Sequence, residues 1–168
     1  MIETAIINEG WDPVVDWEAL SIRAVAAAIA ASPFGALDAL DARIEVSVKF
    51  TSDEDVHALN RDYRHKDKPT NVLSFPMVQP DLIANLANSD DEEVLLGDIV
   101  LAQGVCDREA VERGVSTAAH ATHLIVHGTL HLLGYDHIDD AQAEAMEFLE
   151  QQIMASLGLH DPYQPVED

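Results

Sequence analysis

The chain has few of the features that mark secreted or membrane-spanning proteins. Its single cysteine, Cys106, excludes an internal disulfide. No apolar run reaches the roughly 18 residues that a membrane-spanning helix needs. The first residues also lack the basic region and apolar core of a signal peptide. We therefore expect a cytoplasmic protein with no membrane partner.

Basic and aromatic residues are also scarce. Lys and Arg number 9 against 31 Asp and Glu, which gives a formal net charge of −22, and aromatic residues make up 5% of the chain. Such a surface repels nucleic acid at long range and offers few rings for stacking on bases. Four basic residues nevertheless gather between Arg61 and Lys68. This basic segment is either a solvated helix end or, if it faces a catalytic centre, a phosphate-binding surface.

The apolar pattern predicts one α+β domain over residues 1–168, a single layered domain with a small mixed β-sheet packed by helices. Its length suits one domain, and an apolar content of 48% is that of a folded protein. Alternation and apolar periodicity predict strands at 3–8, 43–51, 72–75 and 94–102, the last interrupted at Gly97-Asp98, and helices at 15–31, 53–63, 105–113, 117–133 and 140–157. Residues 79–93 are predicted to form a mobile surface loop, and the tail from about residue 158 is predicted to be mobile.

One predicted helix carries a row of histidines. Apolar side chains cover most of its circumference, and the remaining stripe holds His120, His123, His127 and His131. Gly134 then offers the left-handed conformation that ends a helix and turns the chain back, so that His137 arrives from outside it. Three neutral imidazoles leave the charge of a metal ion intact and one coordination position open, which is the layout of a catalytic zinc site. We predict one zinc ion per chain, held by His127, His131 and His137.

The spacing H-x-x-x-H-x-x-G-x-x-H of residues 127–137 is also that of the metzincin metalloproteases, so the metal helix is metzincin-like. In those enzymes a Glu directly after the first His is the general base for the zinc-bound water. Here Gly128 occupies that position. Because a general base contributes about 10²–10⁴-fold to the rate, the sequence counts against peptide hydrolysis.

Three segments, in this order, resemble the YbeY family, the bacterial endoribonucleases of ribosomal RNA maturation. Residues Leu59 to Pro76 are similar to the basic loop and following strand of the family, and Leu96 to Val100 to its Gly-Asp strand motif. Residues His127 to His137 are similar to its signature H-G-x-L-H-L-x-G-Y-D-H. Together the three segments extend from Leu59 to His137, about half of the chain.

The resemblance implies a zinc-dependent endoribonuclease that cleaves single-stranded RNA. Its expected roles are maturation of the 3′ end of small-subunit ribosomal RNA and ribosome quality control, in contact with the small ribosomal subunit or its proteins. It implies zinc ligation by His127, His131 and His137, and RNA binding or cleavage by Arg64. A guanidinium beside the metal would bind a phosphoryl oxygen bidentately. Lys66 and Lys68 would extend this positive surface or are solvated charges.

The roles of other residues stay open at this stage. Asp98 is expected to be buried and hydrogen-bonded, either in support of the site or as a structural cap, and Asn71 also matches a family position. His123 is a supporting residue, a fourth ligand or a core residue. Two alternative functions remain: a metal hydrolase of a peptide or small phosphoester, and a ribosome-assembly factor with a structural metal. We expect the acidic side chains to gather away from the site, in residues 81–93 and in the helix from Asp140.

Overall fold

Four strands form one mixed sheet in a computed structural model that describes residues 1–86 and 92–164. The strands are β1 (Ile2–Asn8), β2 (Arg43–Thr51), β3 (Val72–Pro76) and β4 (Glu93–Ala102). Their order is β1-β2-β4-β3; β1, β2 and β4 run in parallel, and β3 pairs antiparallel with β4 at the edge. The predicted fold class, α+β with a small mixed sheet packed by helices, is confirmed.

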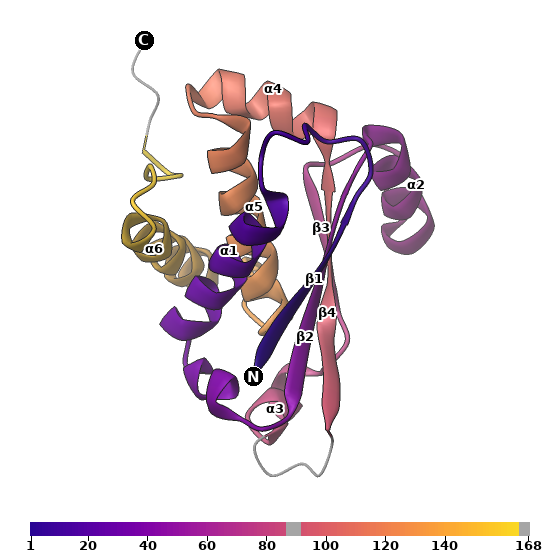
Figure 1. Ribbon diagram of the computed structural model, residues 1–168. Coiled ribbons are helices and arrows are strands. Elements are labelled where there is room, and N and C mark those ends of the chain that lie inside the picture. The colour runs from indigo at the N-terminus through magenta and orange to yellow at the C-terminus, as the bar shows by residue number, and fades with distance from the viewer. Residues whose placement is uncertain (87–91, 165–168) are drawn as a thin grey trace.

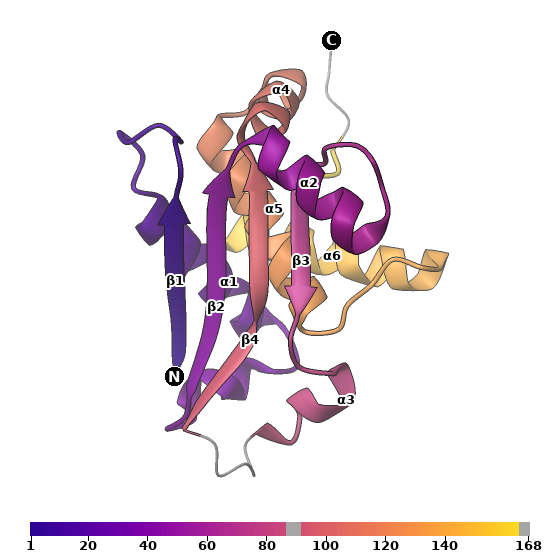
Figure 2. The same ribbon diagram turned by 90° about the vertical axis from the view of Figure 1, so that its right-hand side faces the viewer.

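Helices cover one face of this sheet (Figure 1). They are α1 (Trp17–Ala31), α5 (Thr117–Leu132) and α6 (Asp140–Ser156), while α4 (Gln103–Arg113) follows β4 at the end of the sheet and α2 (Asp53–Arg64) lies on the other face. Helix α5 packs on α1 and on strands β3 and β4, and α6 packs outside it on α1 and α5. Figure 2 shows the opposite face, where α2 lies across one end of the strands. In the described part of the chain, no helix is long and apolar enough to span a bilayer.

Strand β2 shows how the sequence pattern builds the core. Its four apolar side chains are all 0% exposed and belong to the core under the helices: Ile44, Val46, Val48 and Phe50. The intervening Glu45, Ser47 and Lys49 are only half-buried. Successive side chains of a strand point to opposite faces, so the alternating sequence directs the apolar ones toward the helices.

The predicted loop at residues 79–93 is partly wrong. A short helix, α3 (Pro80–Ile83), begins with a proline at its first position, and Ile83 is fully buried in the core. The acidic composition of the segment concealed this apolar anchor. The rest of the prediction falls partly on residues 87–91, which lie outside the described residues.

Two predicted boundaries also change. Strand β4 continues without interruption through Gly97 and Asp98, because the sheet absorbs one extra residue as a register shift between Glu45 and Val46 of β2. Helix α1 begins later than predicted because the side chain of Asp16 caps it, accepting a hydrogen bond of 3.0 Å from the amide of Ala19.

Two glycines allow α5 to lie close to the sheet. A Cβ atom at Gly97 would stand 2.5 Å from both Cδ2 of Leu132 and the carbonyl oxygen of Phe75. A Cβ atom at Gly128 would stand 3.1 Å from Cγ2 of Ile99. Gly128 therefore faces the sheet, and the histidine stripe lies on another side of α5.

Candidate metal centre

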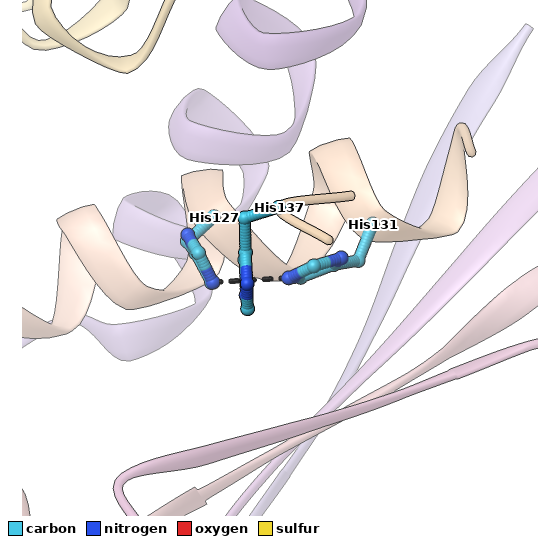
Figure 3. Close-up of side chains that lie close together, drawn as sticks. All are labelled: His127, His131 and His137. Carbon is cyan, nitrogen blue, oxygen red and sulfur yellow. Dashed lines mark hydrogen bonds between the residues drawn. The ribbon is translucent and has the colours of Figure 1, made fainter. Parts of the chain in front are cut away.

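The end of α5 and the turn after it bring His127, His131 and His137 together. Gly134 has φ +97°, the predicted left-handed conformation, and the chain turns back there. The amide of Gly134 donates to the carbonyl of His131, and that of Tyr135 to the carbonyl of Leu130, both at 3.0 Å. One ring nitrogen of each of the three histidines lies within 4.8 Å of the others, and Figure 3 shows the rings gathered around one point.

Hydrogen bonds on the far side of two rings determine where their protons lie. Nδ1 of His131 is 2.9 Å from the carbonyl oxygen of Tyr135, and Nδ1 of His127 is 2.6 Å from Oε1 of Glu150. Burial raises the pKa of Glu150, but contacts from His123, His127 and Tyr163 outweigh it and lower the pKa to about 2. A carbonyl and an ionised carboxylate only accept hydrogen bonds, so both Nδ1 atoms are protonated donors.

The Nε2 atoms of the two rings are then the ones left for a ligand in the cleft. Nε2 of His127 and Nε2 of His131 face each other at 3.0 Å, along the dashed line of Figure 3. Two ring nitrogens at this distance repel unless a proton or a metal ion lies between them. Ligand nitrogens of a tetrahedral zinc ion stand roughly 3.3 Å apart, given the usual Zn–N bond lengths. The donor set therefore fits a metal ion with a small opening of the two rings.

His131 is also kept neutral by its surroundings. Burial is the largest cause and, with the neighbouring His127 and His137, it lowers the pKa of His131 to about 4 against the opposing effect of the Tyr135 carbonyl. A neutral imidazole is the form that binds metal. The ring is therefore ready to act as a ligand at neutral pH without losing a proton.

The histidines line a cleft of about 530 Å³, and Arg64 lines it as well. Arg64 is the last residue of α2 and is exposed, so the predicted phosphate-binding residue and the predicted metal ligands share one cavity. The cleft is also lined by Thr70, Asn71, Ser74, Pro80, Tyr135 and Asp136. Its volume lies within the range of small-ligand pockets.

Asn71 is held at the cleft by the half-buried Glu109, which the buried His120 also contacts. Its Nδ2 donates to Oε1 of Glu109 at 2.9 Å, and the same oxygen is 2.8 Å from Nε2 of His120. The hydrogen bond from His120 lowers the pKa of Glu109, opposed by burial. His120 therefore contacts the Glu109 carboxylate and is not part of the three-histidine group. Through this carboxylate it supports Asn71.

Lys66 and Lys68 lie on the surface beyond Arg64 and are outside the residues that line the cleft. Their loop is nevertheless anchored. The side-chain amide of the buried Asn60 donates to the backbone carbonyl of Lys68 at 2.8 Å. The backbone carbonyl of Asn60 accepts from the backbone amide of Lys66 at 3.1 Å. His65 adopts φ 58° to end α2 and start this loop. Both lysines are free to contact a ligand that extends out of the cleft.

Asp98 and His123 lie outside the three-histidine group. Asp98 is half-buried and lines a groove with Ser47 and Lys49 on the face of the sheet away from α5, so its expected burial is wrong, and it lies away from the three histidines. The cause is the strand alternation that turns Gly97 toward α5. His123 is buried and stands 3.3 Å from Glu150, outside the group of His127, His131 and His137.

Sequence reasoning missed Glu150, which contacts His127, and Tyr163, whose hydroxyl donates to Glu150. One signal was available for the first. Glu150 lies on the apolar face of α6, four residues after Met146 and four before Met154, both of which are buried. A carboxylate on a buried helix face requires polar partners, and the histidine stripe supplies them.

Comparisons with known proteins show the family to which this chain belongs. The family model described as Endoribonuclease YbeY matches residues 15–158. A protein named Endoribonuclease YbeY from Rhizorhabdus wittichii is 64% identical over 100% of both chains. Proteins of the same name from Sphingopyxis alaskensis and Zymomonas mobilis are 62% identical over 91% of each chain, and 50% identical over 95% of this chain and 90% of the relative.

A solved structure has the same fold. The solution structure of a Thermotoga maritima protein is similar with a TM-score of 0.54 and 20% sequence identity, and the match covers 97% of this chain and 100% of that chain. At this identity the likeness concerns the fold alone.

Proposed function

Because the chain belongs to the YbeY endoribonuclease family, we propose that it is a zinc-dependent endoribonuclease that cleaves single-stranded RNA. The proposed substrate is the 3′ end of small-subunit ribosomal RNA during maturation, with a further role in ribosome quality control. The proposed partner is the small ribosomal subunit or one of its proteins. The enzyme would act in the cytoplasm as one domain over residues 1–168, with one zinc ion per chain.

The observation that carries this proposal is the pair of facing Nε2 atoms of His127 and His131, joined by His137 and placed in one cleft with Arg64. A zinc ion held by the three histidines would supply Lewis acidity toward a phosphoryl oxygen or a water molecule. Three neutral ligands would leave its double positive charge undiminished, which suits an anionic substrate.

The chain's own residues have separable parts in the reaction. Arg64 would bind a second phosphoryl oxygen with two parallel N–H groups and stabilise the negative charge that develops there. Lys66 and Lys68 would hold phosphates next to the cleft. Asp136 fixes the turn that presents His137, because its Oδ1 accepts from the His137 amide at 2.8 Å.

The two alternative functions are less well supported. A Glu at the position of Gly128, where the metzincin proteases have their general base, would meet Ile99 of the sheet. A structural zinc would need four protein ligands, whereas the group around His131 holds three histidines. Both observations favour an open catalytic site on a phosphate-bearing substrate.

Arg64 offers a direct test with a matched control. Arg61 lies three residues earlier on α2, is exposed and pairs with Asp62 at 3.1 Å, and does not line the cleft. We expect Arg64→Ala to lower the rate of single-stranded RNA cleavage by about 10²–10³-fold, as when a charge-stabilising donor is lost, and Arg61→Ala to leave it close to wild type. Cleavage of a labelled RNA under single-turnover conditions measures both.

Equal rates for Arg64→Ala, His131→Ala and the wild type, with and without a chelator, would contradict the proposed function. An equal loss in Arg61→Ala and Arg64→Ala would instead indicate general electrostatic attraction and remove the specific role of Arg64.

A further inference from the structure

Helix α6 carries one carboxylate, that of Glu150, that is buried next to the candidate metal centre. Glu150 is 0% exposed and lies between Met146 and Met154 on the buried face of the helix. A buried charge is costly unless several groups bind it. Glu150 has three such contacts: Nδ1 of His127 at 2.6 Å, Nε2 of His123 at 3.3 Å, and the hydroxyl of Tyr163.

The contact with Glu150 determines which ring nitrogen of His127 is available to a metal. An ionised carboxylate can only accept, so Nδ1 of His127 carries a proton, and in the neutral form of the ring, the form that binds metal, Nε2 carries the lone pair. Nε2 is the atom that faces His131. Without this acceptor the neutral ring would exchange between tautomers and rotate more freely, and part of the population would present an N–H group to the metal position.

Tyr163 connects this carboxylate to the segment after α6. The chain turns at Gly158, with φ +73°, and runs back along the helices. Arg113, at the end of α4, donates to the carbonyl of Pro162 at 2.7 Å, and Pro162 is buried. The Tyr163 ring meets the His123 ring edge-on at 5.8 Å. The tail that was predicted to be mobile thus has, up to residue 164, defined contacts that hold the Tyr163 hydroxyl against Glu150.

We propose that Glu150 is a positioning residue that fixes His127 with Nε2 toward the metal, and that Tyr163 of the C-terminal segment holds Glu150 for this task. The inference rests on the proposed metal-dependent function and extends the site to α6 and the segment after it. Carboxylates that bind the outer nitrogen of a metal-bound histidine typically contribute about 10–100-fold to metal affinity.

Glu150 could instead be a metal ligand, because His123, His127 and Glu150 also offer three atoms within 4.8 Å of one another. The distance between Oε1 of Glu150 and Nδ1 of His127 favours the positioning role. At 2.6 Å it is that of a charge-assisted hydrogen bond, whereas two ligand atoms of one zinc ion stand roughly 3.3 Å apart. A proton, and not a second metal ion, fits between these atoms.

Four variants separate positioning from folding. Glu150→Met removes every acceptor and fits the apolar neighbours of the helix, and Glu150→Gln restores an acceptor oxygen without the charge. Tyr163→Phe removes one hydroxyl from a side chain that is already 36% exposed, so it is expected to fold. Glu144→Gln, on the exposed face of α6, is the matched control.

The first measurement is the zinc dissociation constant by competition with a fluorescent chelator. We expect Glu150→Met to bind zinc about 10–100-fold more weakly, Glu150→Gln and Tyr163→Phe to fall between it and the wild type, and Glu144→Gln to match the wild type. Wild-type affinity in both Glu150→Met and Tyr163→Phe would overturn the proposal. Two zinc ions per wild-type chain would also overturn it, since Glu150 would then be a ligand.

The second measurement reads the ring proton in metal-free protein by long-range ¹H–¹⁵N NMR. The proposal expects His127 protonated at Nδ1 in the wild type and a mixed or Nε2-protonated ring in Glu150→Met. His127 protonated at Nε2 in the wild type would overturn it. This measurement needs neither zinc nor RNA, so it decides the role of Glu150 even if the wild type binds no zinc and the proposed function fails.

Discussion

At the scale of single side chains, the proposed metal site depends on where the protons lie on the rings of His127 and His131. The Tyr135 carbonyl and the Glu150 carboxylate each hold a proton on Nδ1 of one ring, and the two Nε2 atoms are left facing each other. The turn at Gly134 supplies the first acceptor and helix α6 the second. Neither acceptor would contact the metal, but by binding Nδ1 each leaves Nε2 as the nitrogen that can.

The pKa of His131 gives a prediction for the metal-free protein. The pKa of His131 is about 4 in the folded protein and about 6.5 in the unfolded chain. Between these two pH values the ring is therefore protonated in the unfolded chain but not in the folded protein. The stability contributed by this ring is therefore complete above pH 6.5 and is lost as the pH falls toward about 4. An NMR titration of the ring Cε1–H signal should give a midpoint near pH 4, and a midpoint at or above 6.5 would show that the ring is not desolvated.

Among the helices and strands, the contact between α5 and β4 places the metal ligands. We expect Gly97→Ala to destabilise the protein by about 1–3 kcal/mol, because its Cβ would stand 2.5 Å from a backbone oxygen that cannot move aside. Gly128→Ala should be nearly neutral, since the Ile99 side chain can yield and alanine favours a helix by about 1 kcal/mol over glycine. Urea unfolding of both variants measures the two changes in the free energy of unfolding. An equal loss of stability would mean that the two contacts adjust equally to an added methyl group.

Local patterns in the sequence predicted most of these elements. The alternation of β2 predicted its bounds, Arg43–Thr51, and α2 and α5 begin at the predicted residues, where the side chains of Ser52 and Ser116 cap them. The turn at Gly134 and the approach of His137 also followed from local chemistry. Each of these features depends on residues close together in the chain, which sequence patterns describe well.

Contacts between distant segments could not be predicted in this way. Glu150 meets His127 only because α6 packs on α5, and Asp98 faces away from the site only because Gly97 faces α5. The helical anchor at Ile83 was hidden by acidic neighbours. Packing selects these partners, and composition or spacing carries little information about it.

For the protein as a whole, the charge of −22 must be reconciled with an anionic substrate. The described acidic side chains are not all remote: Asp136 lines the cleft, and Asp62 and Asp67 lie within the basic segment. The expected separation of acids from the site is therefore incomplete. The proposed RNA binding would then depend on a few well-placed basic side chains and on the proposed metal ion.

The salt dependence of RNA binding tests this view. If Arg64, Lys66 and Lys68 each contact one phosphate, the logarithm of the association constant should fall with the logarithm of salt concentration with a slope of roughly −2. Arg64→Ala should reduce the slope by about 0.7, and Arg61→Ala should leave it unchanged. Fluorescence anisotropy with a single-stranded RNA measures these slopes; equal slopes in all three proteins would exclude a phosphate contact by Arg64.

The central claim is that the three histidines hold the metal ion that cleaves RNA, and His137→Ala tests it most directly. His137 is an exposed ligand after the end of α5, so its loss should leave the fold intact. Zinc content and RNA cleavage are measured in the same preparations of wild type and variant. We predict about one zinc per wild-type chain, reduced zinc binding in the variant, and a cleavage rate at least about 100-fold lower. Cleavage at the wild-type rate by His137→Ala, or by wild type stripped of metal, would contradict the account.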